Sequence, residues 1–406
     1  MRTPVAAYSA FAAFGAFWGT WGAALPALRN AAGVDEAELG AALLFVGLGA
    51  MPAMLLIGRL VDRFGTRTAG WLLISLALAG LVLTSTARDL PTLAAGMALV
   101  GATSGAADVA ANALAGLAEQ RSGRRVITLA HGVFSSFVAI GSLGTGALRA
   151  AGAGVLTLFA AAAALMAIAG AVVLVLGDGP ASATPARSGR RRDSARLALP
   201  FVAVGLIGAF AFAAENAHQS WSAIFLADEL AAGAGLSAVA PATFAVSAAV
   251  TRFTAGVLTR IPPGRLLIGG AGVALLGTLV VSAAPDVPIA LAGLALAAAG
   301  TSVLFPTLLS RATRDVPPSR RGRATSAVAT TAYLGFVLGP VYVGVLAGAV
   351  GLHGAMVGVA LLLAAFALLA PAVTRRSGEA TAAAESSAHK TNAVSAAENS
   401  DAEASR

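Results

Sequence analysis

Twelve long apolar segments constrain the fold of this chain more than any other feature of its sequence. A helix needs roughly 20 mostly apolar residues to cross a bilayer, and each segment is about that long. Hydrophobic residues make up 57% of the 406 residues and charged residues 11%, whereas a soluble domain carries about 25% charged residues. We therefore predict an all-α polytopic membrane protein with crossing segments 5–28, 39–57, 68–87, 92–117, 126–148, 152–177, 197–226, 237–259, 265–284, 287–312, 323–348 and 352–373.

The polar stretch 178–196, which contains five Arg residues, divides these segments into two sets of six. Residues 1–177 and 197–373 are equal in length, and we expect each to form a six-helix bundle on either side of a central loop. Two such halves around a midplane site are a known plan of secondary transporters. Residues 374–406 have no apolar run and are rich in Ala, Ser and Glu, so we predict a disordered tail.

The distribution of Arg residues predicts the orientation. If the N-terminus is cytoplasmic, 21 Arg residues fall on the cytoplasmic side, and only Arg29, Arg88 and Arg149 lie in outside loops. Cytoplasmic loops of membrane proteins are enriched in Lys and Arg. We expect both termini, the central loop and the tail to face the cytoplasm, in the inner (plasma) membrane of a bacterium.

Several kinds of chemistry find no support in the sequence. The chain has no Cys, which excludes disulfides, thiolate metal sites and thiol catalysis. It has no Gly-x-x-x-x-Gly-Lys-Ser/Thr loop for ATP, and no cluster of His and acidic residues with metalloenzyme spacing. We expect no cofactor, no metal and no nucleic-acid partner, because the Arg residues lie between apolar segments rather than on one face. Since one chain holds both halves, a monomer in the lipid bilayer is expected.

A short polar loop follows the second apolar segment and reads Gly58-x-x-x-Asp62-Arg63-x-Gly65-x-Arg67. It resembles the signature loop of the major facilitator superfamily. The resemblance implies the major facilitator fold and a gating role for this loop, which would bind neighbouring helix ends in one state and release them in another. Ordinary cytoplasmic anchoring would explain the Arg residues but not Asp62 with its two glycines.

The similarity extends over most of residues 10–370. It includes Trp21-Gly-Ala-Ala-Leu-Pro26, Asp108-Val-Ala-Ala-Asn112, His131-Gly132-Val-Phe134, Glu215 with Trp221-Ser222, Phe305-Pro306 and Tyr333-Leu-Gly335-Phe-Val-Leu-Gly339-Pro340. These stretches resemble the group around the rhizopine uptake protein MosC, and Asp108-x-x-x-Asn112 is also similar to an element of fucose–proton symporters. The resemblance implies a transporter of a sugar or polyol-like solute. Ser220 departs from the acid expected just before the Trp in the MosC-like group.

Asp108 is the main candidate for proton binding, because a charge inside a membrane segment is costly and is usually functional. A carboxylate in a low-dielectric cavity holds its proton up to a higher pH than one in water, so it can bind and release a proton at the working pH. Asn112 lies one turn further on the same helix face and could hold a hydroxyl group or the protonated acid. The alternative is a structural ion pair of Asp108 with Arg63 or Arg252.

Glu215, Asn216 and Gln219 are the candidates for solute binding in the second half, with Trp221 as an aromatic wall. Sugar sites combine amides and carboxylates with an aromatic surface, because a pyranose has hydroxyl groups at its rim and apolar faces. The alternative is a polar helix face against the outer vestibule.

Three further residues have two interpretations each. Trp21, like Trp18, either lines a cavity or belongs to the outer aromatic belt. His131 makes an ordinary polar contact or relays protons. Arg252 either extends to the cytoplasmic interface or pairs with a carboxylate during gating.

The sequence therefore favours a proton-coupled secondary transporter of a small solute, working by alternating access, and not an enzyme. Proton-driven efflux of a drug or metabolite is the alternative. A polytopic enzyme acting on lipids is disfavoured, because the outside acids are scattered over separate loops.

Overall fold

The computed structural model describes residues 2–123, 126–177, 194–255, 261–314, 316 and 318–404. Its elements confirm the predicted all-α class. They are α1 (Arg2–Ala32), α2 (Glu36–Phe64), α3 (Thr68–Thr86), α4 (Leu90–Ser122), α5 (Val126–Ala150), α6 (Val155–Leu176), α7 (Ser194–Asp228), α8 (Ala234–Ser237), α9 (Val239–Ala255), α10 (Pro263–Ser282), α11 (Val287–Thr313) and α12 (Pro318–Ala404).

Within the described residues, ten helices are long and apolar enough to cross a membrane. One of these, Ala324–Pro371 in α12, is 48 residues long, which is enough for two crossings. The helix breaks inside this stretch at Gly351, whose φ of 75° and ψ of 170° are not helical. With α12 divided at Gly351, and with the 31-residue α1 included, the helices are compatible with the twelve predicted segments.

Acidic residues that the orientation assigns to outside loops act as helix N-caps. The Asp35 side chain accepts a hydrogen bond from Glu38 N at 2.8 Å and starts α2. Asp89 caps α4 by accepting a hydrogen bond from Thr92 N at 2.9 Å. Asp286 caps α11 by accepting one from Ile289 N, also at 2.9 Å. A capping carboxylate satisfies amide groups that the first turn leaves free. These acids therefore have a local structural reason to lie where they do.

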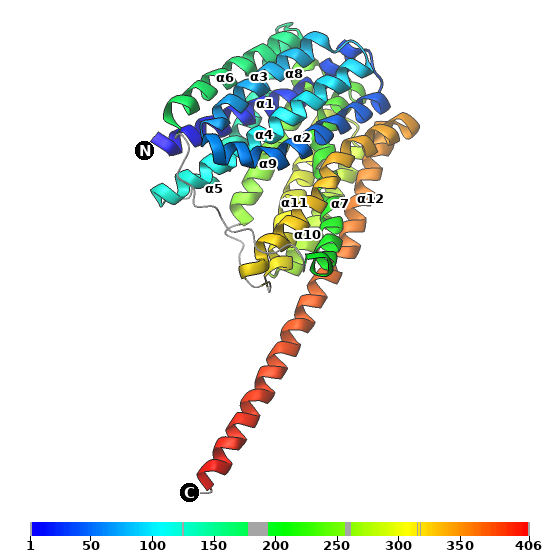
Figure 1. Cartoon of the computed structure of the whole chain (residues 1–406). Coiled ribbons are helices and arrows are strands. Elements are labelled where there is room, and N and C mark those ends of the chain that lie inside the picture. Colours follow the sequence, from blue (N-terminus) through cyan, green and yellow to red (C-terminus); the bar gives the residue numbers. More distant parts are fainter. Residues whose placement is uncertain are drawn as a thin grey trace.

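Helices α1–α6 pack against one another, as do α7–α12, and Figure 1 shows these halves in blue to cyan-green and in green to red. Glycine allows the close approaches within each half. A Cβ added at Gly101 would clash with the Val46 carbonyl, and one at Gly335 with the Ala209 carbonyl. Small residues at such contacts are typical of helices that associate in lipid. Most of the predicted central loop, residues 178–193, lies outside the described residues.

Contacts between the two halves concentrate at one end of the molecule. There Ser142 Oγ donates to Ala238 O at 2.6 Å, and Gly40 of α2 packs directly against Gly344 of α12. α5 and α9 also meet towards the other end, where the Phe253 ring lies over Gly132. Among the described residues, α4 makes no extended contact with any helix of the second half. The halves are therefore joined most closely at the end that the orientation assigns to the outside.

The backbone of α12 continues past Pro371 to Ala404 and leaves the bundle as one long helix (Figure 1). This is the segment for which the composition predicts disorder. Its many Ala residues have the highest helix propensity, but a helix without tertiary packing rests on propensity alone and is marginal in water. Disorder of this tail in solution stays a prediction.

Candidate functional site

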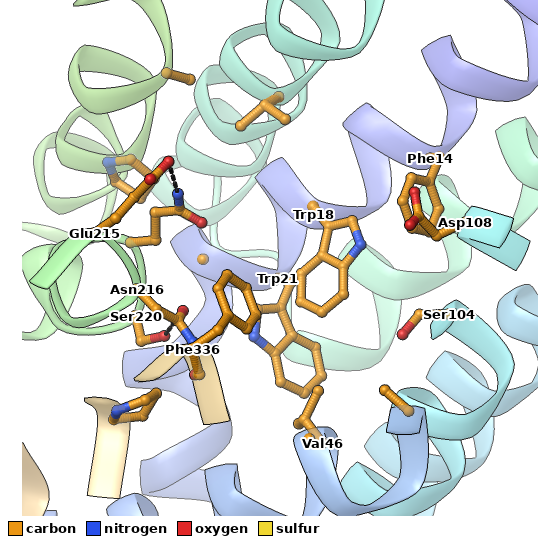
Figure 2. A pocket seen from close by; sticks show the side chains of 18 of the residues that line it. Phe14, Trp18, Trp21, Val46, Ser104, Asp108, Glu215, Asn216, Ser220 and Phe336 are labelled. Carbon is orange, nitrogen blue, oxygen red and sulfur yellow. Dashed lines mark hydrogen bonds between the residues drawn. The ribbon is translucent and has the colours of Figure 1, made fainter. Parts of the chain in front are cut away.

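A cavity of about 330 Å³ lies between the two halves. Helices α1, α2, α4 and α5 line it from the first half, and α7, α9 and α12 line it from the second. Figure 2 shows Asp108 and Glu215 on opposite sides of this cavity, with Trp18 and Trp21 between them. The two membrane carboxylates singled out in the sequence thus face one space.

Asp108 lies on α4 and lines the cavity with Ser104, one turn before it. Asn112 Nδ2 donates to Asp108 Oδ1 at 3.1 Å and also to the Asp108 carbonyl at 2.9 Å. Of the ion pairs formed by the described residues, none includes Asp108. The expected pairing of Asp108 with Asn112 is present, whereas the alternative of an ion pair with Arg63 or Arg252 is not what this conformation shows.

Aromatic side chains form two walls of the cavity. On α1, Trp18 and Trp21 lie edge to face with their rings 5.7 Å apart. On α12, Tyr333 and Phe336 stack with centroids 5.2 Å apart. Of the two interpretations of Trp21, the structure places its ring in the cavity lining rather than in an aromatic belt.

Glu215 forms the polar centre of the second half. Its Oε1 accepts a hydrogen bond from Arg252 Nη2 at 2.9 Å and another from Gln219 Nε2 at 3.3 Å. All three residues line the cavity. Arg252 lies in the last turn of α9 and reaches Glu215 instead of extending away from the bundle.

Asn216 lines the same cavity, but its side chain amide is committed to the protein. It donates to the Phe336 carbonyl of α12 and accepts from Ser220 Oγ at 3.1 Å. Ser220, the residue that departs from the MosC-like pattern, therefore orients Asn216. This network fixes α7 against α12 and leaves Gln219 as the amide better placed for a ligand.

Trp221 and His131 do not line the cavity that Asp108 and Glu215 share. Trp221 is fully buried, and its Nε1 donates to the Pro340 carbonyl at 3.2 Å. The expected aromatic wall comes instead from α1 and α12. His131 is exposed on α5 and lies against the Phe11 ring with centroids 5.0 Å apart.

The signature loop expected over residues 58–67 is helical in its first part, since α2 continues to Phe64 and only residues 65–67 connect it to α3. The described side-chain contacts of Arg63 and Arg67 stay within their own half. Gly65 ends α2 with a φ of 75°, which favours glycine because it has no Cβ. Arg67 Nε donates to the Gly177 carbonyl at the end of α6, at 3.1 Å. Arg63 lies over the Phe64 ring, 5.2 Å from its centroid, and a Cβ added at Gly58 would meet nothing within 4 Å. The side chain of Asp62 lies outside those that the structure describes.

The sequence contains a pattern on α1 that predicts more of the aromatic cavity lining than Trp21 alone. Phe14, Trp18 and Trp21 are spaced i, i+4 and i+7, which places them on one helix face, and all three line the cavity. Phe134, Tyr333 and Phe336 also line it, although the sequence alone does not set them apart from other apolar residues.

Comparison with known proteins identifies the family. A sequence model of the Major Facilitator Superfamily matches residues 6–279 and 204–399. An uncharacterised MFS-type transporter of Yersinia pestis is 30% identical over 365 residues, which cover 86% of this chain and 90% of the relative. The membrane protein MosC of Rhizobium meliloti is 26% identical over 344 residues, or 82% of this chain and 80% of MosC.

Solved structures share the fold at low sequence identity. A bacterial homologue of the human lysosomal transporter Spinster, in an inward-facing and occupied conformation, has a TM-score of 0.73 at 15% identity and covers 92% of this chain and 96% of its own. A D-xylose–proton symporter has a TM-score of 0.70 at 14% identity, covering 91% and 96%. The resemblance that the sequence motifs indicated is confirmed. The chain therefore belongs to the Major Facilitator Superfamily, and it is a multi-pass membrane transporter rather than an enzyme.

Proposed function

We propose that this transporter takes up a small polyhydroxylated solute, a sugar or polyol, together with a proton. The two halves would rock about the central cavity and open it alternately to each side of the membrane. We place the protein in a bacterial inner membrane as a monomer, with both termini in the cytoplasm, because the Arg distribution favours that orientation.

The observation that carries this proposal is the composition of the cavity between the halves. It combines one carboxylate without an ion pair among the described residues, Asp108, with a hydrogen-bonding group of Glu215, Gln219 and Arg252. Trp18 and Trp21 add flat apolar surfaces beside them. A sugar or polyol has both kinds of surface, since its hydroxyl groups project from an apolar carbon frame.

Asp108 is our candidate for the proton site. It is half-buried, and the hydrogen bonds that it accepts from described side chains come from the neutral amide of Asn112. A carboxylate that no cation neutralises binds a proton more readily than one held in an ion pair. The sugar–proton symporter among the structural neighbours supports this proposal by analogy, since it shares the fold.

The conformation fits the inward-facing state of such a cycle. The halves are joined most closely at the end of Arg29 and Asp228, which the proposed orientation puts outside. The signature loop with Gly58, Asp62, Arg63, Gly65 and Arg67 lies at the opposite end, and we retain it as a proposed gate for the outward-facing state.

The test is proton movement in lightly buffered, right-side-out vesicles that hold the purified protein. We expect external alkalinisation when D-xylose, D-glucose, mannitol or myo-inositol is added, and no response from protein-free vesicles. A response confined to cationic drugs would favour the efflux alternative, for which the aromatic walls and Asp108 are also suited. No response to any sugar or polyol would contradict the proposal.

A further inference from the structure

The ion pair of Glu215 and Arg252 lies within one half of the protein and not between the halves. Glu215 belongs to α7 and Arg252 to α9, and their side chains are 12% and 46% exposed. A pair inside one half keeps its geometry when the halves move, so it does not lock either end of the cavity. It requires a role other than gating.

The hydrogen bonds of this pair leave a defined surface for a ligand. Both donors, Arg252 Nη2 and Gln219 Nε2, use the same oxygen of Glu215, Oε1. Among the described residues, none donates a hydrogen bond to Glu215 Oε2 or to the side-chain oxygen of Gln219. Glu215 Oε2 and the side-chain oxygen of Gln219 are therefore two available acceptors beside the guanidinium donors of Arg252. Such an arrangement of donors and acceptors suits adjacent hydroxyl groups of a solute.

Arg252 is held from a second side. Its Nε points to the Ser302 carbonyl of α11 at 3.5 Å, while Nη2 bonds Glu215. The guanidinium thus spans α7, α9 and α11 and fixes the direction of the Glu215 carboxylate. A hydrogen bond between two ionised groups, such as that of Arg252 with Glu215, is stronger than one between neutral groups.

The net charge of the cavity lining depends on three residues. Asp108, Glu215 and Arg252 are the charged residues of the described lining. Glu215 and Arg252 neutralise each other, so the cavity has no net charge once Asp108 holds a proton. A charged solute entering that state would lose its hydration without gaining a counter-charge, which is costly in a low-dielectric site.

We propose that Glu215 and Arg252 form a specificity pair that restricts the proton-loaded cavity to uncharged solutes, with Arg252 as the positioning residue of Glu215. This inference rests on the proposed function and deepens it. Glu215, paired with Arg252, binds the solute through Oε2, whereas Asp108 carries the proton. The two carboxylates have separate tasks because one has a cation beside it and the other does not.

The test compares three probes of similar shape: glucose, glucosamine as its cation and glucuronate as the anion. Binding to the purified full-length chain is followed by tryptophan fluorescence, because Trp18 and Trp21 line the cavity. Glu215→Gln leaves Arg252 unpaired, and we expect the ratio of glucuronate to glucose affinity to rise by about tenfold. Arg252→Gln leaves Glu215 unpaired, and the ratio of glucosamine to glucose affinity should rise similarly.

Two further variants separate charge selection from misfolding. The double variant Glu215→Gln/Arg252→Gln restores neutrality and should again prefer glucose, and Arg252→Lys should keep the natural preference. Two results would refute the specificity pair. In the first, the single variants bind glucose and keep the charge preference of the natural chain. In the second, the single variants and the double variant lose affinity for all three probes to the same extent. If the natural chain binds none of the probes, the proposed function itself fails.

Discussion

Arg29 and Asp228 form an ion pair that joins the two halves of the transporter, with 2.5 Å between Arg29 Nη1 and Asp228 Oδ2. The same nitrogen lies 2.8 Å from Glu36 Oε1, which belongs to the first half like Arg29 itself. In the proposed cycle, opening of this end would move Asp228 away, whereas Glu36 would stay beside Arg29 in the first half. Glu36 would then remain a partner for Arg29 in the open state and lower the cost of separating the charges.

Loss of Asp228 should favour opening at this end. A partly exposed ion pair contributes about 1 kcal/mol, so Asp228→Asn should raise the ratio of open to closed molecules about fivefold. Because the natural chain has no Cys, spin labels at Thr86→Cys and Ala283→Cys, exposed positions at the ends of α3 and α10, report the distance between the halves. An unchanged distance distribution would show that the pair does not control this end.

Loss of Glu36 should have the opposite effect. Glu36→Gln removes the partner that remains after opening, so the closed form should gain population in the same distance measurement. Glu38→Gln is the matched control, because it neutralises a neighbouring acid in the same way. The Glu38 side chain accepts a hydrogen bond from Asp35 N at 3.0 Å. A glutamine still fits that capping box. Equal effects of both changes would indicate a general charge effect rather than a role for Glu36.

Close helix packing predicts different results for two glycines of α4. Gly101→Ala would place its Cβ against the Val46 carbonyl of α2, and overpacking of this kind costs about 1–3 kcal/mol. Gly116→Ala meets nothing within 4 Å and should be neutral or stabilising, since Ala favours a helix. Thermal unfolding in detergent should give a lower midpoint for Gly101→Ala alone. Equal midpoints would contradict the packing described for α2 and α4.

The aromatic wall should contribute directly to solute affinity. Trp18→Ala removes a ring from the cavity lining and should weaken glucose binding about tenfold, or roughly 1.4 kcal/mol. Calorimetry of the purified protein measures this. Trp71→Ala serves as the control, because Trp71 is 63% exposed on α3 and lies outside the cavity lining. An equal loss in both variants would assign the effect to general destabilisation.

The sequence was sufficient for the all-α class and for the charged residues that line the cavity. Length and hydropathy placed the membrane segments, because the bilayer sets both requirements. A charge inside such a segment is costly, so the sequence alone indicates Asp108 and Glu215 as candidates. It also indicates Arg252, although it leaves open whether this side chain extends to the interface or pairs with a carboxylate.

The arrangement of the aromatic side chains could not be predicted as well. Trp221 follows Glu215 by six residues, which is about 240° around a helix, so the two side chains point in different directions. Whether such a ring meets a cavity or a neighbouring helix depends on packing, and α12 covers Trp221. The sequence likewise favours Asn216 as a solute-binding residue, but its side-chain amide already donates a hydrogen bond to the Phe336 carbonyl of α12.

Asp108 is the residue on which the proposed coupling depends. The most direct test measures solute accumulation in proteoliposomes under an imposed pH gradient, alongside exchange of solute without a gradient. For the natural chain we expect the gradient to drive accumulation of the sugar or polyol that moves protons. In Asp108→Asn, accumulation should be lost while exchange remains, because the amide cannot release a proton. Undiminished accumulation in Asp108→Asn would contradict the assignment of the proton to this carboxylate.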